Sequence, residues 1–407
     1  MKRTAPLVVL LLCLLLVGLP LLAATSAKPA AKSGKTPGVE MAALVTQITG
    51  IAISPLLGVS AVGAWQWWKT PAEKRDTLPW FARPEFFLCG LLLVTAVAVK
   101  DAAGATLPPG WKKPLDVAET VENKVSGLVA AGAVIPSLVL LASKFMAESS
   151  GLPPVEMTGT GLAMLPVAAF DFSWLLAAAM VPLSIAVFGV VWLASHAINV
   201  LILLSPWGGV DAALKAARTA LLGLVTATAW IDPVVGATLS VVIILIAWLV
   251  AGWAFRLMVF GWVFCWDTFT FRRRRFGVLA DGNRMFLGRK LAGAPLRTYG
   301  RLCSGGDEKL VFKYRPWLVL AEREVEVPRA GLVVGRGVFY SEVLGHDEAA
   351  DRARTLLLLP PRYLGHEELL ARTYHIPGTC EVGLRRAWSW LKEAIGFKPR
   401  PAALGAA

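Results

Sequence analysis

The residues best suited to chemistry are charged side chains that lie between two apolar stretches: Lys100, Asp101, Asp116, Glu119, Glu122 and Lys124. On a helix, the three carboxylates from Asp116 onward would follow one another at i,i+3 steps and share one face. Charged side chains at membrane depth mark paths for ions or substrates. Lys100, Asp101, Asp116 and Glu119 are therefore a candidate polar membrane site. The alternative is a solvated loop whose carboxylates offset Lys112 and Lys113.

Three further polar residues interrupt apolar stretches. Arg256 could pair with an acidic residue, reach towards the membrane surface, or mark where a long helix leaves the bilayer, and we favour the second reading. His196 and Asn199 lie on neighbouring faces of another stretch. We expect them to bond to an adjacent helix, with proton relay as the alternative.

The C-terminal part shows no catalytic grouping. His366-Glu367 lacks the second histidine of a zinc-binding H-E-x-x-H motif, and Gly331–Gly337 lacks the G-K-[ST] of a phosphate loop. The five cysteines contain no C-x-x-C pair. We therefore predict that the protein is not an enzyme and holds neither a metal nor a cofactor.

Composition indicates a membrane protein. The 407 residues are 56% hydrophobic and only 17% charged, whereas soluble domains are about 25% charged. Most of the net charge of +13 lies after Phe271. Beside an apolar helix, a basic tail indicates attraction to anionic lipid headgroups rather than to nucleic acid. We predict the lipid bilayer as a partner and expect no nucleic acid.

The N-terminus has the pattern of a secretory signal peptide over residues 1–27, with a basic start and a leucine-rich run. An uncleaved anchor is the alternative. The Lys/Pro/Ala-rich residues 28–40 predict a disordered linker.

Residues 41–271 predict a transmembrane helical bundle, because about 20 apolar residues cross a bilayer. We expect five spans after the signal peptide, near 41–64, 86–107, 125–143, 172–204 and 233–266. Asp211–Trp230 predicts an amphipathic helix that lies in the interface. Asp232-Pro233 predicts the start of the last helix, because proline favours a first helical position.

A run of four arginines follows the last span: Arg272, Arg273, Arg274 and Arg275. Arginines beside a span hold that end in the cytoplasm. We predict a membrane-surface anchor here, a cytoplasmic C-terminus and localisation in a bacterial inner membrane.

Residues 276–397 predict a cytosolic, mainly-β (α+β) domain with a C-terminal helix. Lys309–Leu320, Glu324–Val327, Gly331–Leu344 and Thr355–Leu359 have strand character, and Glu367–Tyr374 is helical in pattern. A pleckstrin-homology-like barrel would suit this order. The domain could bind lipid headgroups or a protein partner, and a homo-oligomer is left open.

The short motifs of the helical region resemble a known family. Leu78-Pro79-Trp80, Lys100-Asp101, a loop with Pro114 and Asp116, and the segment Leu203–Asp211 are similar to bacterial multi-pass proteins with domain-of-unknown-function 4126. The likeness covers about residues 41–271. The family has no established activity, so the resemblance implies no functional residue.

Two functions from different classes follow. The first is transport or permeation of a small solute or ion through the predicted polar site. The second is a membrane-anchored scaffold or sensor, whose cytosolic domain recognises headgroups or a protein.

Overall fold

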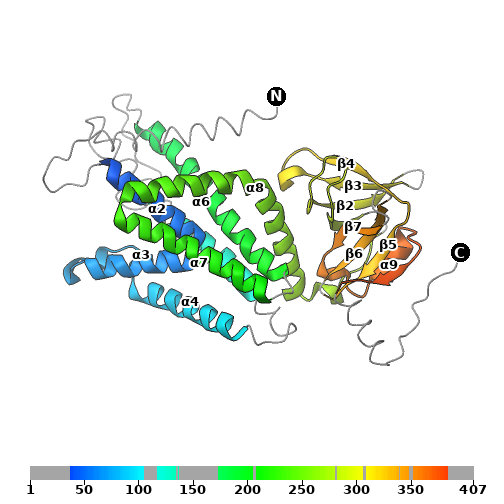
Figure 1. Ribbon diagram of the computed structural model, residues 1–407, viewed down its shortest axis with the longest axis horizontal. Coiled ribbons are helices and arrows are strands. Elements are labelled where there is room, and N and C mark those ends of the chain that lie inside the picture. The colour runs from blue at the N-terminus through cyan, green and yellow to red at the C-terminus, as the bar shows by residue number, and fades with distance from the viewer. Residues whose placement is uncertain are drawn as a thin grey trace. The chain divides into compact units, whose positions relative to one another are not determined.

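The computed structural model describes residues 37–104, 117–133, 136, 173–204, 208–279, 282–305, 309–338, 340–347 and 352–383. These residues form two compact units, a helical one that ends at Ala254 and a second that begins at Phe255 and contains a β-sheet (Figure 1). The predicted signal peptide and Asp116 lie outside the described residues.

The helical unit consists of helices and short 3₁₀ turns in the residues that the structure describes (Figure 1). Two 3₁₀ turns, η1 (Ala72–Thr77) and η2 (Trp80–Ala82), join α3 to α4. A helical segment at 117–133 lies between α4 and α6 in the sequence. The named helices are α2 (Pro37–Ile53), α3 (Pro55–Lys69), α4 (Pro84–Gly104), α6 (Ser173–Leu204), α7 (Gly208–Ile231) and α8 (Pro233–Phe269).

Helix α2 packs against α3, α6 and α7, and α3 packs against α4. Two glycines permit the approach of α3 and its neighbours. A Cβ on Gly63 would stand 2.2 Å from the carbonyl oxygen of Phe81, and one on Gly90 would stand 2.1 Å from Ser60 Oγ. Small residues at such positions let helices lie close together.

The prediction of five membrane spans is wrong. Among the described residues, only two helical stretches are long and apolar enough to cross a bilayer, Pro182–Leu204 and Pro233–Phe269. The predicted first span divides into α2, with 17 residues, and α3, with 15 residues. Each is shorter than the roughly 20 residues that a crossing needs.

Two local causes explain the difference. Ser54 has non-helical angles (φ −137°, ψ 84°) and Pro55 starts a new helix, since proline cannot donate the hydrogen bond that would continue α2. Among the described residues, the apolar helix Pro84–Val97 is too short to cross a bilayer. Of the predicted third span, the structure describes residues 125–133 and 136.

The second unit holds one eight-stranded sheet with the order β4-β3-β2-β1-β7-β6-β5-β8. All neighbours are antiparallel except β5 and β8. The short helix α9 (Glu367–Thr373) precedes β8, and η3 (Arg272–Arg274), η4 (Pro316–Leu318) and η5 (Pro361–Tyr363) are 3₁₀ turns. The strands are β1 (Asn283–Leu287), β2 (Tyr299–Ser304), β3 (Leu310–Tyr314), β4 (Arg323–Val327), β5 (Val333–Arg336), β6 (Ser341–Asp347), β7 (Arg352–Leu359) and β8 (Thr379–Glu381).

Alternating side chains of the strands build the core of this unit. Leu302 on β2 lies opposite Phe312 on β3, which lies opposite Val325 on β4, and all three are buried. The Tyr374 hydroxyl donates to the Leu302 carbonyl (2.7 Å) and accepts from Asn283 Nδ2 (2.7 Å). The mainly-β prediction is confirmed, whereas the pleckstrin-homology-like barrel stays a prediction.

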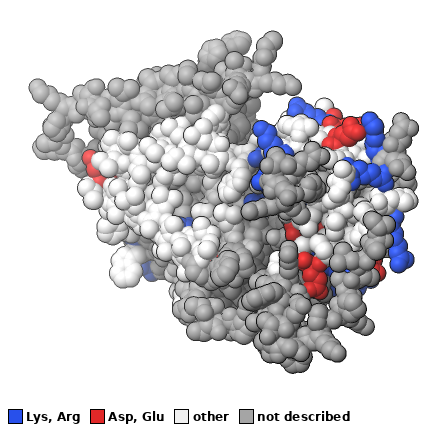
Figure 2. All heavy atoms as spheres, turned by 45° about the vertical axis from the view of Figure 1, so that its right-hand side comes forward, with Lys and Arg blue, Asp and Glu red and all other residues white. Residues whose placement is uncertain are grey.

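Charged side chains are unequally distributed over the surfaces of the two units. On the face shown in Figure 2, the described atoms of the helical unit are mostly uncharged, while lysine, arginine, aspartate and glutamate side chains gather on the β unit. Exposed apolar side chains, including Leu92, Ile246 and Leu249, lie on the helices. A contiguous apolar surface is typical of a protein that contacts lipid or a partner.

Candidate functional site

Two helices of the first unit bring opposite charges together. Lys215 on α7 forms an ion pair with Glu119 of the 117–133 segment, with 3.3 Å between Nζ and Oε2. One turn further along each helix stand Arg218 and Glu122, and their charges act on each other. The α7 helix therefore supplies two cations at i,i+3 spacing, and the 117–133 segment supplies two carboxylates at the same spacing that face them.

Arg218 is held by two neutral oxygens. Its Nη1 donates to Asn199 Oδ1 on α6 (2.7 Å), and its Nε donates to the carbonyl of Ile53 (3.0 Å). That carbonyl belongs to the last residue of α2, where helical oxygens lack the usual partner. The Ser195 hydroxyl donates to it as well (2.6 Å). The interruption before Pro55 thus creates an acceptor for Arg218.

His196 is a further polar side chain buried between the helices. Its Nδ1 lies 2.9 Å from Asn123 Oδ1, and its ring stacks on Trp192 with 5.3 Å between the centroids. The predicted bonds of His196 and Asn199 to adjacent helices are confirmed. No described group bonds to His196 Nε2 or to Asn199 Nδ2, although both atoms are buried.

A cavity of about 200 Å³ opens onto these groups, and its walls come from α3, α4, α6, α7, the 117–133 segment and Ser54, which lies between α2 and α3. A water molecule takes about 30 Å³ in the liquid, so the space suits a small ion or solute with little water. Its polar lining residues are Ser54, Glu119, Glu122, Asn123, Asn199, Lys215, Arg218 and Thr219.

Burial raises the pKa of Glu122, against the opposing effects of the Ser126 hydroxyl, which donates to it, and of Arg218. Burial also lowers the pKa of Arg218, which the carboxylates of Glu119 and Glu122 oppose. With Glu122 protonated, the charged lining residues are two cations and one carboxylate. With Glu122 ionised, the two signs balance. The state of one proton therefore decides whether the cavity favours an anion.

The predicted polar site overlaps only in part with the charged cluster that lines this cavity. Glu119 is a member of the observed cluster. Lys100 and Asp101 lie near the C-terminal end of α4, and the structure does not describe their side chains or any part of Asp116. The sequence analysis placed Lys215 and Arg218 on an interfacial helix and missed their role. Matching i,i+3 charges of opposite sign on two predicted helices were the signal that could have found them.

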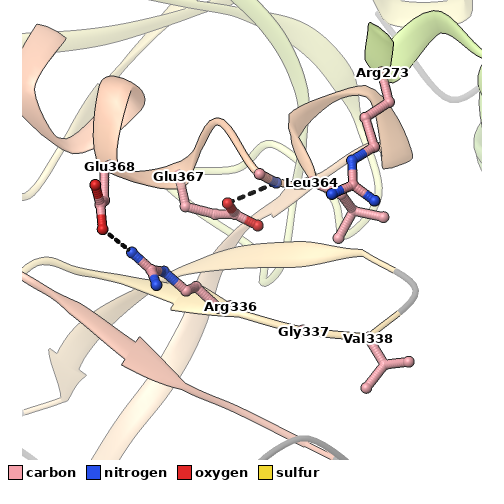
Figure 3. A pocket seen from close by; sticks show the side chains of 8 residues that line it. Arg273, Arg336, Gly337, Val338, Leu364, Glu367 and Glu368 are labelled. Atoms are coloured by element: carbon pink, nitrogen blue, oxygen red, sulfur yellow. Dashed lines mark hydrogen bonds and ion pairs between the residues drawn. The ribbon is translucent and has the colours of Figure 1, made fainter. Parts of the chain in front are cut away.

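The β unit has a second hollow of about 370 Å³ (Figure 3). Arg273 and Arg336 line it together with the backbone at Gly337 and Gly365. Arg336 pairs with Glu368. The buried Glu367 accepts from the Ser341 hydroxyl (2.7 Å) and from the Gly365 amide (2.7 Å). Glu367 and Glu368 thus already bind donors of the protein. Within the residues that the structure describes, the Arg273 guanidinium has no hydrogen-bond or ion-pair partner.

The predicted membrane-surface anchor lies at the end of α8. Arg272, Arg273 and Arg274 form η3 and are exposed. Arg275 Nη2 donates to the Thr270 carbonyl (2.8 Å), and the Arg273 carbonyl lies 3.0 Å from His366 Nε2. This places the run beside the hollow of the β unit.

Within the described ranges, no group of three or more His, Cys, Asp or Glu side chains could hold a metal ion. No protein-family model, curated protein or solved structure matches the chain. The resemblance to the domain-of-unknown-function 4126 proteins therefore stays a prediction.

Proposed function

We propose that this chain is an integral membrane protein whose helical unit binds a small anion in the cavity between α3, α4, α6, α7 and the 117–133 segment and passes it across the bilayer. The observation that carries the proposal is the cavity of about 200 Å³ lined by Lys215, Arg218, Glu119 and Glu122. The long apolar helices α6 and α8 support membrane insertion. The arginine run after α8 supports a cytoplasmic β unit.

Energetics support a binding role for Arg218. A buried cation is costly unless it is paired and hydrogen-bonded. The hydrogen bonds of Arg218 go to two neutral oxygens, on Asn199 and Ile53, so an apolar side chain would serve packing alone at lower cost. In the part of the chain that the structure describes, the buried Asn199 Nδ2 and His196 Nε2 have no hydrogen-bond partner, and Asn199 lines the cavity. A bound anion would give Arg218 and Lys215 an additional partner.

The test is flux into vesicles that contain the purified full-length protein. Uptake of chloride and of acetate is followed with a trapped dye while a potassium gradient sets the membrane potential. Arg218→Met should lower uptake at least tenfold. Thr226→Ala is the matched control on α7, because the Thr226 hydroxyl bonds only to its own helix, at Leu222 (2.9 Å). Equal uptake by wild type and Arg218→Met would refute the proposal.

A second function, headgroup recognition by the β unit, is favoured by the hollow of about 370 Å³ at Arg273. Arginine binds phosphate through paired hydrogen bonds. In detergent, phosphatidylglycerol should raise the melting temperature of the wild type more than phosphatidylcholine does. Arg273→Gln should remove that difference, whereas Lys309→Gln, an exposed change elsewhere on the unit, should keep it. An equal response to both lipids would exclude this function.

A further inference from the structure

A loop of consecutive apolar residues projects from the β unit between β3 and β4. Trp317, Leu318, Val319 and Leu320 are 48%, 45%, 81% and 50% exposed. Soluble surfaces seldom expose such a run, because each side chain gives up the gain of burial. The loop is therefore expected to contact a partner or a lipid surface.

The backbone of the loop holds these side chains outward at a cost. Trp317 and Leu318 have positive φ angles of 56° and 64°. For residues other than glycine the left-handed region costs about 1–2 kcal/mol. An ion pair between Arg315 Nε and Glu322 Oε2 (3.4 Å) closes the base of the loop. Such strain persists where the surrounding structure enforces it, typically at functional sites.

The loop lies against α8 at one defined level. The Trp317 ring contacts the Phe255 ring, with 4.8 Å between centroids. Phe255 is the last residue of the charge-free run that begins at Pro233. That run is about 33 Å long, which is one bilayer core. Arg256 follows, and its Nε donates to the Leu296 carbonyl of the β unit (3.0 Å).

We propose that Trp317–Leu320 inserts into the lipid surface at the level where α8 leaves the bilayer. The occupant is lipid, because Trp317 contacts Phe255, where the charge-free run of α8 ends, and the arginines near these two residues in the sequence, Arg256 and Arg315, suit the phosphate groups. Tryptophan at this depth is typical of membrane interfaces. The inference rests on the membrane insertion proposed above.

The test attaches an environment-sensitive fluorophore to single cysteines in full-length protein whose natural cysteines are replaced, in phosphatidylcholine–phosphatidylglycerol vesicles. The positions are Val319→Cys, Lys309→Cys and Leu249→Cys. Lys309 precedes β3 at the end opposite the loop, and Leu249 is a 74% exposed residue of the charge-free run. Lipids that carry a quencher near the headgroup should quench Val319→Cys several-fold more than Lys309→Cys.

The three positions separate the possible outcomes. If Leu249→Cys is quenched by lipids labelled near the bilayer centre but Val319→Cys responds no more than Lys309→Cys, the loop inference is overturned while membrane insertion stands. If Leu249→Cys is not quenched either, membrane insertion itself is refuted. The fluorescence at Val319→Cys could instead change with the protein concentration and not with the amount of quencher lipid. That result would show that the loop contacts protein, and it would overturn the inference.

Discussion

Asp267 Oδ2 accepts a 2.6 Å hydrogen bond from Arg362 Nε, and the two side chains are 0% and 4% exposed. The Arg362 amide also donates to that oxygen (3.3 Å), and Arg272 lies 3.9 Å from Oδ1. Asp267 stands in the last turn of α8, and Arg362 stands in η5 directly after β7. This buried pair therefore fixes the end of α8 to the sheet.

Arg362→Met should destabilise the β unit by about 3–5 kcal/mol, because it leaves a buried carboxylate without its main partner. Differential scanning fluorimetry in detergent measures the change. The double variant Asp267→Leu/Arg362→Met should recover most of the loss, since no buried charge remains. Equal losses for the single and double variants would show that the pair matters through packing instead.

Gly127→Ala should destabilise the helical unit by about 1–3 kcal/mol, as overpacking does. The added Cβ would stand 2.1 Å from Trp192 Nε1, and Trp192 supports His196. Gly132→Ala is the matched control in the same helical segment, since no described atom lies within 4 Å of its Cβ. The control should gain about 1 kcal/mol from helix propensity. Thermal unfolding would contradict this account if both variants shifted alike.

Glu122 predicts a pH dependence of stability. Burial raises its pKa in the folded protein above the unfolded value, so the folded state keeps a proton that the unfolded chain has lost. The stability linked to this proton is complete below the unfolded pKa of about 4.3 and is lost as the pH rises through the folded pKa. Arg218, Lys215 and Glu119 are the charged groups around it.

Glu122→Gln imitates the protonated carboxyl and should remove this decline. Melting temperatures of wild type and Glu122→Gln, measured from pH 4 to pH 8, should therefore diverge towards high pH, with the variant relatively more stable there. Ser126→Ala removes the hydroxyl that lowers the pKa of Glu122 and should steepen the decline. Parallel curves for the wild type and Glu122→Gln would contradict the assigned pKa shift.

Local signals in the sequence predicted several elements well. Asp232-Pro233 predicted the start of α8, and the Val234 amide indeed donates to Asp232 Oδ1 (2.7 Å). The alternation at Glu324–Val327 predicted β4, whose side chains alternate between solvent and core. These features depend on residues that are close in the sequence, so they can be predicted from the sequence.

Of the features that the sequence prediction missed, the break between α2 and α3 is local, and the contacts of Arg218 are tertiary. Hydropathy counted residues 41–64 as one span, although a single interruption at Ser54-Pro55 makes two short helices. Amphipathic spacing showed that α7 has a polar face but not that Arg218 would meet Asn199 and the Ile53 carbonyl. A carbonyl freed by a helix end is a backbone feature that residue types do not reveal.

A charge exchange between Glu119 and Lys215 tests the central claim most directly. Chloride uptake into vesicles should fall at least tenfold for Glu119→Lys and for Lys215→Glu, because each replaces the ion pair at the cavity by two like charges. The double variant Glu119→Lys/Lys215→Glu should recover much of the uptake, since the pair and the cavity charge are restored. Uptake that equals the wild type in both single variants would contradict the claim that this cavity conducts anions.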